Sequence, residues 1–114
     1  MRSKVLTSVV LVVAATACGS SVPPPNDQWA AAQADLGRAE ASGAASNPDA
    51  RLHVQLAQED LASAHRLMGR DNVRATTLTQ LARAEAQLAS SLAAESAAND
   101  DASKAAAEMQ GGRP

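Results

Sequence analysis

The chain has almost no aromatic side chains: Trp29 is the only one, and Phe and Tyr are absent from all 114 residues. Aromatic rings usually supply much of the wall of a deep ligand pocket and of any surface that stacks nucleic-acid bases. Positive charge is also scarce, because 10 Lys and Arg stand against 12 Asp and Glu and leave a net charge of −2. The sequence therefore argues against an enclosed apolar pocket and against nucleic acid as a partner.

Residues that carry catalytic or metal chemistry are equally sparse. Cys18 is the only Cys, which excludes an intramolecular disulfide. His53 and His65 lie twelve positions apart, which places them about 120° apart around a helix and too distant to share one metal ion. The sequence has neither a glycine-rich phosphate loop nor a serine nucleophile elbow. We therefore predict a protein that is not an enzyme and that has no cofactor and no metal site.

The N-terminal segment has the organisation of a secretory signal. Arg2 and Lys4 form a short positive region, and an apolar run from Val5 to Ala15 follows it. A helix needs about 20 apolar residues to span a bilayer, so this run is too short to be a transmembrane span. Residues 1–17 are therefore predicted to be a signal peptide.

Cys18 follows this segment directly, and Ala15-Thr16-Ala17-Cys18 resembles the bacterial lipobox, with Ala where Leu is usual. The resemblance implies that Cys18 becomes the first residue and carries diacylglyceryl and a third chain such as palmitate. Two or three chains anchor a protein stably, at about 0.8 kcal/mol per buried CH₂ group. Gly19, rather than Asp, implies an outer-membrane anchor facing the periplasm. The alternatives are a plain secreted protein with an incidental Cys and an uncleaved anchor.

The rest of the chain is predicted to be all-α. Residues 18–26 form a lipidated Cys and a tether with three prolines, and residues 27–98 form a helical domain. Helices are predicted at about 27–45, 48–68 and 72–98 from three kinds of boundary signal. The first is a cap at Asn26 or Asp27, the second is Asn47-Pro48-Asp49, and the third is Gly69 with a cap at Asp71 or Asn72. Residues 99–114 are expected to be a frayed or disordered tail.

Alanine fills 28 positions, so the helices form readily but have few large side chains to pack. The first helix carries its small and apolar residues on one stripe, which consists of Trp29, Ala32, Leu36, Ala39 and Gly43. The expected fold is a slender three-helix bundle or a flat helical layer.

The predicted helix 48–68 has two apolar faces. One consists of Ala50, Val54, Ala57, Leu61, Ala64 and Met68, and the other of Leu52, Leu56 and Leu67. A helix with two apolar faces needs two surfaces to cover it. Either the other helices flank it in a flat layer, or Leu52, Leu56 and Leu67 form a partner-binding face.

Glu85 interrupts the predicted apolar stripe of helix 72–98, which consists of Leu78, Leu81, Leu88 and Leu92. An unpaired buried carboxylate is costly, so Glu85 must reach solvent or a partner. Candidate partners are Arg66, His65 and His53. We expect a structural pair and not a catalytic acid.

Between Leu36 and about Ala94 the chain resembles an Ala-rich helical domain family of small bacterial lipoproteins, of uncharacterised function and sometimes fused to an OmpA-like domain. The matching residues are Leu36-x-x-Ala39, Gly43-Ala44, Asn47-Pro48-Asp49, Leu56-Ala57-x-x-x-Leu61-x-x-Ala64, Gly69-x-Asp71 with Ala75, and Leu81-x-x-Ala84-x-Ala86-x-Leu88-Ala89. The resemblance implies an all-α lipoprotein and transfers no functional residues. The chain ends before an OmpA-like domain, so peptidoglycan binding is not carried over.

These features predict a periplasmic lipoprotein that acts as an envelope structural or adaptor module through helix–helix contacts. Its partners are the membrane, through Cys18, and an envelope protein or a second copy. The alternatives are a Braun-type coiled-coil lipoprotein, which requires uninterrupted heptads and a terminal Lys, and a carrier of small lipidic ligands.

Overall fold

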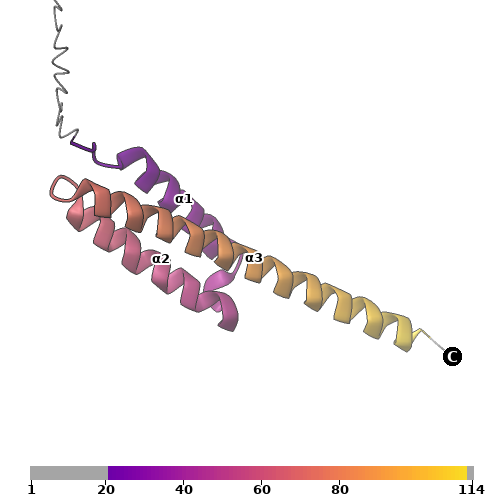
Figure 1. Ribbon diagram of the computed structural model, residues 1–114. Helices are drawn as coiled ribbons and strands as arrows, with labels where there is room; N and C mark the ends of the chain where they lie inside the picture. Colours follow the sequence, from indigo (N-terminus) through magenta and orange to yellow (C-terminus); the bar gives the residue numbers. More distant parts are fainter. Residues whose placement is uncertain (1–20, 113–114) are drawn as a thin grey trace, which may run out of the picture.

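The computed structural model describes residues 21–112, and these residues form helices and turns without any β-strand. The order is α1 (Asn26–Ala41), the short 3₁₀ helix η1 (Ala44–Ser46), α2 (Pro48–Leu67) and α3 (Asn72–Gly111). The helices α2 and α3 form an antiparallel hairpin, and α1 packs along the first half of α3 (Figure 1). The all-α prediction is therefore confirmed.

The predicted boundaries of α2 and the start of α3 are also confirmed. Asn47 Oδ1 accepts hydrogen bonds from the backbone N–H groups of Asp49 and Ala50, at 2.9 and 3.1 Å. These bonds satisfy two of the donors that a helix leaves unpaired at its N-terminus. Gly69 then reverses the chain with a φ of +81°, a conformation that glycine adopts without steric cost. Asp71 caps α3 by accepting from Arg74 N at 3.0 Å.

The first helix differs from the prediction at both ends. It begins at Asn26 after Pro25, and no side chain caps it, so the predicted cap at Asn26 or Asp27 is wrong. It ends at Ala41 and not near residue 45, because Gly43 has a φ of +88° and turns the chain into η1. The left-handed conformation of Gly43 therefore ends α1 four residues earlier than expected.

The end of the predicted tether is attached to the bundle. Asn72 Nδ2 donates to Val22 O at 2.7 Å, and Pro25 is buried. The chain therefore enters the bundle beside the turn that joins α2 to α3. The far end of α3 lies at the opposite end of the molecule (Figure 1).

The helices form a bundle in which each contacts both others, and α3 is the central one (Figure 1). The flat layer with helix 48–68 in the middle is therefore not the observed arrangement. The reason lies in the alanines of α3, which allow two helices to approach it closely. Its buried residues recur at spacings of three and four: Ala75, Thr79, Ala82, Ala86, Ala89 and Ala93.

This alanine seam replaces the predicted leucine stripe of α3. Leu81 and Leu88 are 46% and 44% exposed, and Leu78 and Leu92 are half-buried. On α2 the prediction is confirmed, because Ala50, Val54, Ala57, Leu61 and Ala64 are buried. Small side chains bring the α2 and α3 backbones together, and the larger leucines lie beside the seam.

The third helix continues well beyond the bundle. It ends at Gly111 and not near Ala98, and residues 97–112 are all exposed. The predicted frayed or disordered tail is therefore helical to residue 111, while residues 113–114 lie outside the described part. The high helix propensity of Ala102, Ala105, Ala106 and Ala107 outweighs the weak helix breakers at 99–101. At 40 residues, α3 is about 60 Å long and projects as an arm.

Candidate functional site

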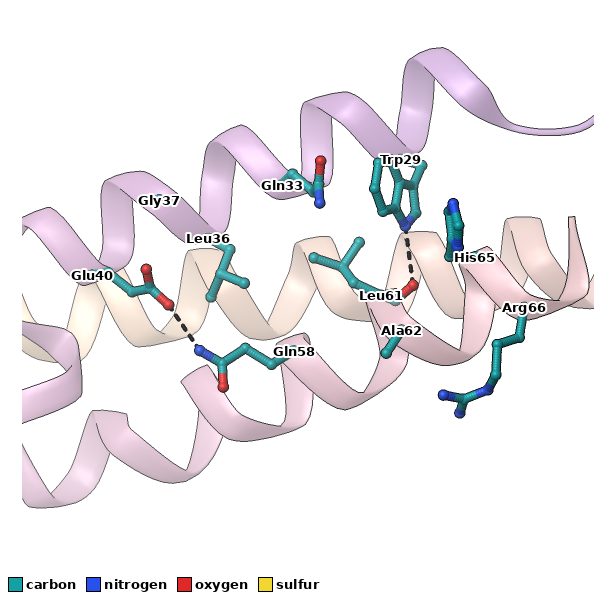
Figure 2. Close-up of a pocket in the computed structure, with 10 residues that line it drawn as sticks. All are labelled: Trp29, Gln33, Leu36, Gly37, Glu40, Gln58, Leu61, Ala62, His65 and Arg66. Atoms are coloured by element: carbon teal, nitrogen blue, oxygen red, sulfur yellow. Dashed lines mark hydrogen bonds between the residues drawn. The ribbon is translucent and has the colours of Figure 1, made fainter.

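An open groove of about 560 Å³ lies between α1 and α2 (Figure 2). Leu36 and Leu61 form its apolar floor, and the space beside Gly37 at its edge is open, since a Cβ atom there would meet nothing within 4 Å. Gln58 Nε2 donates to Glu40 Oε1 at 2.8 Å and closes one end. The groove has an apolar centre and polar ends, which suits an amphipathic molecule.

Trp29 forms the other end of this groove. Its indole Nε1 donates to the backbone carbonyl of Leu61 at 3.0 Å, and its ring lies 5.1 Å from the ring of His65 (Figure 2). The bond satisfies the one polar atom of the indole and fixes α1 to α2. Arg66 follows His65 at the rim of the groove, where its guanidinium donates to Ser63 Oγ at 3.0 Å. The sequence placed Trp29 on the buried stripe of α1, and the structure shows it half-buried at the edge of that stripe.

Asp35 on α1 contacts two arginines, Arg83 on α3 and Arg38 on its own helix. Arg83 Nε donates to Asp35 Oδ2 at 2.7 Å, and Arg38 Nη2 contacts Asp35 Oδ1. The Asp35 side chain is 7% exposed, whereas that of Arg83 is 52% exposed. A buried carboxylate with two cationic partners is well satisfied, so this cluster stabilises the fold and offers no free reactive group. Sequence reasoning missed it, because nothing links positions 35 and 83 before the chain folds.

His53 and Glu85 form a second polar contact, between α2 and α3. His53 Nδ1 lies 2.5 Å from Glu85 Oε2, and both side chains are mostly buried. The prediction that Glu85 takes a partner from Arg66, His65 or His53 is confirmed, and His53 is that partner. Asp60 lies near this pair. Desolvation raises the pKa of the Asp60 carboxyl, and the charges of Glu85 and Glu59 raise it further.

The leucines of α2 and α3 gather on the side of the hairpin away from α1. Helical spacing places Leu81 and Leu88 opposite Arg83, which contacts α1, and it places Leu56 opposite Gln58. We call this surface the leucine face. It consists of Leu52, Leu56 and Leu67 on α2 and Leu78, Leu81, Leu88 and Leu92 on α3.

No helix of residues 21–112 covers the leucine face. Leu52 is 57% exposed, and Leu56 and Leu67 are half-buried. The three leucines predicted to form a partner-binding face therefore lie on one surface, together with four leucines that were expected to be core. The contact of His53 on α2 with Glu85 on α3 lies at the centre of this face. Leu52 is next to His53 in the sequence, and Leu88 is three residues after Glu85. A contiguous exposed apolar patch is a candidate surface for association.

The remaining predictions concern the lipid anchor, metal binding and membrane spans. Cys18 and the signal segment 1–17 lie outside the described residues. Within residues 21–112, His53 and His65 join no cluster of metal-ligating side chains, and no helix is long and apolar enough to cross a membrane.

Comparison of the chain with protein-family models, with curated proteins and with solved structures finds no match.

Proposed function

We propose that this protein is a lipid-anchored module of the bacterial envelope that acts without catalysis, as a structural or adaptor protein. The observation that carries the proposal is the leucine face, which exposes Leu52, Leu81 and Leu88 on one side of a hairpin with a small alanine core. Apolar surface of this kind gains free energy when another helical surface covers it, at about 25 cal/mol per Å².

The anchor is supported by the sequence and by where the chain enters the bundle. Cys18 follows a short apolar signal segment, at the position where the lipobox pattern requires it. The tether meets the bundle at Val22 and Asn72, beside the α2–α3 turn. A membrane at that end leaves the arm of α3 directed away from it, which suits a protein that reaches toward another envelope component.

Metabolic labelling tests the anchor. Bacteria expressing the full chain are grown with a palmitate analogue, and the wild type is compared with Cys18→Ser. We expect label in the wild type only, and the wild type in the outer-membrane fraction. A wild type that takes up no label, or that is recovered in the soluble periplasmic fraction, would contradict the anchored placement.

Mild detergent extraction followed by native electrophoresis tests whether the protein forms a complex through the leucine face. We expect the wild type to migrate as a complex in native electrophoresis and the double variant Leu81→Gln/Leu88→Gln to migrate as a monomer. Val73→Gln is the matched control, because Val73 is 62% exposed and lies off the leucine face. A wild type that is monomeric, or a complex that the double variant leaves intact, would refute this role.

The groove between α1 and α2 supports a second candidate function, the binding of a small amphipathic ligand. Leu36 and Leu61 would contact an apolar tail, and Arg66 would attract a carboxylate. Trp29 lines this groove and is the only fluorophore of its kind in the chain. Titration with a medium-chain fatty acid should then give a saturable shift of its emission, weakened by Arg66→Gln. An emission spectrum that does not change would exclude this function.

The Braun-type alternative is less favoured by these helices. Its single coiled coil needs uninterrupted heptads, whereas Gly43 and Gly69 turn this chain twice. A stable trimer of the full chain in sedimentation would support it.

A further inference from the structure

The pattern of α3 on the leucine face is symmetric about its own middle. Arg74, Leu81, Leu88 and Glu95 follow one another at intervals of seven residues, so they form one column along the helix. The midpoint of this column lies between Leu81 and Leu88, next to Glu85. Reversing the column places leucine on leucine and a positive end on a negative end.

We propose that the leucine face is a two-fold interface with a second copy of this chain, in which α3 packs antiparallel on α3 of the other copy. A two-fold contact requires a self-complementary surface, in which residue i meets j and j meets i. The column meets that requirement, because Leu81 lies opposite Leu88 of the other copy and Arg74 lies opposite Glu95, each twice. The inference rests on the proposed use of the leucine face and not on the anchor.

The other residues of the face agree with the same axis. Leu78 and Leu92 lie seven residues on either side of Glu85. On α2, Leu52 and Leu56 lie on either side of Val54, and the contact of His53 with Glu85 places that point level with the midpoint of the α3 column. These four leucines of the two helices therefore share one axis with the column, whereas Leu67, near the end of α2, has no counterpart across it.

Charge supports a second copy over an unrelated partner. Neither Arg74 nor Glu95 takes part in an ion pair within residues 21–112, and both are exposed. The antiparallel arrangement gives each of them an opposite charge. At the axis, the two copies of Glu85 approach one another, and each keeps its own His53. The repulsion between the two carboxylates limits the affinity of the dimer.

The size of the face is sufficient for a weak specific dimer. The α3 column covers roughly 30 Å by 10 Å, and residues 48–60 of α2 cover roughly 20 Å by 10 Å, or about 500 Å² on each copy. Two copies would then bury about 1,000 Å², which is the threshold for a weak specific interface. The antiparallel arrangement also separates the two tethers, so a dimer with both anchors in one membrane lies along its surface, whereas the arm of a single anchored copy is directed away from it.

Cysteine cross-linking tests the arrangement on the full chain carrying Cys18→Ser, so that the introduced thiols are the only ones. Leu81→Cys and Leu88→Cys proteins are purified separately, mixed and oxidised. A disulfide requires Cα atoms within about 7 Å, so we expect it in the mixture and not in either protein alone. Gln80→Cys mixed with Gln87→Cys is the matched control, because it has the same spacing on another exposed side of α3.

Charge reversal provides the second readout. Arg74→Glu should weaken the dimer at least tenfold in sedimentation equilibrium, and Arg74→Glu/Glu95→Arg should restore it. Circular dichroism verifies that each variant keeps its helices. Equal cross-linking in the Leu81→Cys protein alone, equal cross-linking of the control pair, or a double reversal that fails to restore the dimer would overturn the inference. A complex in envelope extracts without the Leu81–Leu88 disulfide would assign the face to another protein and leave the proposed function standing.

Discussion

His53 Nδ1 on α2 lies 2.5 Å from Glu85 Oε2 on α3, and this contact crosses the hairpin at the centre of the leucine face. It supplies the partner that a carboxylate among leucines requires. The side chains of His53 and Glu85 are 24% and 19% exposed, so neither is freely solvated. The contact crosses from α2 to α3 beside the alanine seam that packs the two helices together.

Removing one member of this pair should cost more than removing both. We expect His53→Leu to lower the free energy of unfolding by about 1–2 kcal/mol, because it leaves Glu85 partly buried without a partner. The double variant His53→Leu/Glu85→Leu should recover most of this loss. Urea denaturation of the four proteins of the cycle measures the coupling. Additive effects of the two single changes would contradict a direct interaction.

The alanine seam predicts that enlarging a buried alanine is harmful. Ala86→Leu should destabilise the bundle by about 1–3 kcal/mol, because the added atoms push α2 and α3 apart. Ala84→Leu is the matched control on the exposed side of the same helix and should change the stability by less than about 0.5 kcal/mol. Thermal unfolding distinguishes them. A variant Ala86→Leu as stable as the wild type would place the seam elsewhere on α3.

Replacing Asp35 is predicted to lower the free energy of unfolding, because this buried carboxylate pairs with two arginines. Asp35→Ala removes the contacts with Arg83 and Arg38 together, and we expect a loss of about 1.5–3 kcal/mol. Arg38→Ala should cost less, because Arg83 continues to pair with the buried carboxylate. Chemical denaturation of both variants measures the order. An Arg38→Ala that costs as much as Asp35→Ala would contradict the assignment of Arg83 as the main partner.

Asp60 is predicted to weaken the fold at neutral pH. Burial, Glu85 and Glu59 raise its pKa above the ordinary 3.8, so the folded state holds this proton more tightly than the unfolded chain does. The resulting penalty is absent below the ordinary pKa and develops as the pH rises through the raised one. Asp60→Asn should therefore raise the melting temperature at pH 7 and leave it unchanged near pH 3. A stabilisation that is equal at both pH values would show that charge is not the cause.

The helix boundaries were largely predictable because local residues set them. Asn47, Pro48 and Gly69 each act on the backbone within a few positions, so their effect is visible without a fold. Gly43 carried the same signal for the end of α1, although the prediction placed that end later. The end of α3 differs from the prediction because the alanines after residue 101 extend the helix through the weak breakers at 99–101.

The buried side of α3 could not be chosen from the sequence. Leucines and alanines both recur at helical spacing on α3, and the larger side chains were the natural choice for a core. Which stripe is buried depends on how closely α2 and α1 approach, and this depends on the alanines of all three helices. The contact of Asp35 with Arg83 was hidden for the same reason, since only the packed bundle brings the two together.

Site-specific photocrosslinking in living bacteria determines whether the leucine face is the surface through which the protein acts. A photoreactive amino acid replaces Leu88 in one full-length protein and Gln80 in another, and both are irradiated in the intact envelope. We predict a discrete protein adduct from position 88 and none from position 80. Equal adducts from both positions, or none from position 88, would show that the leucine face is not that surface.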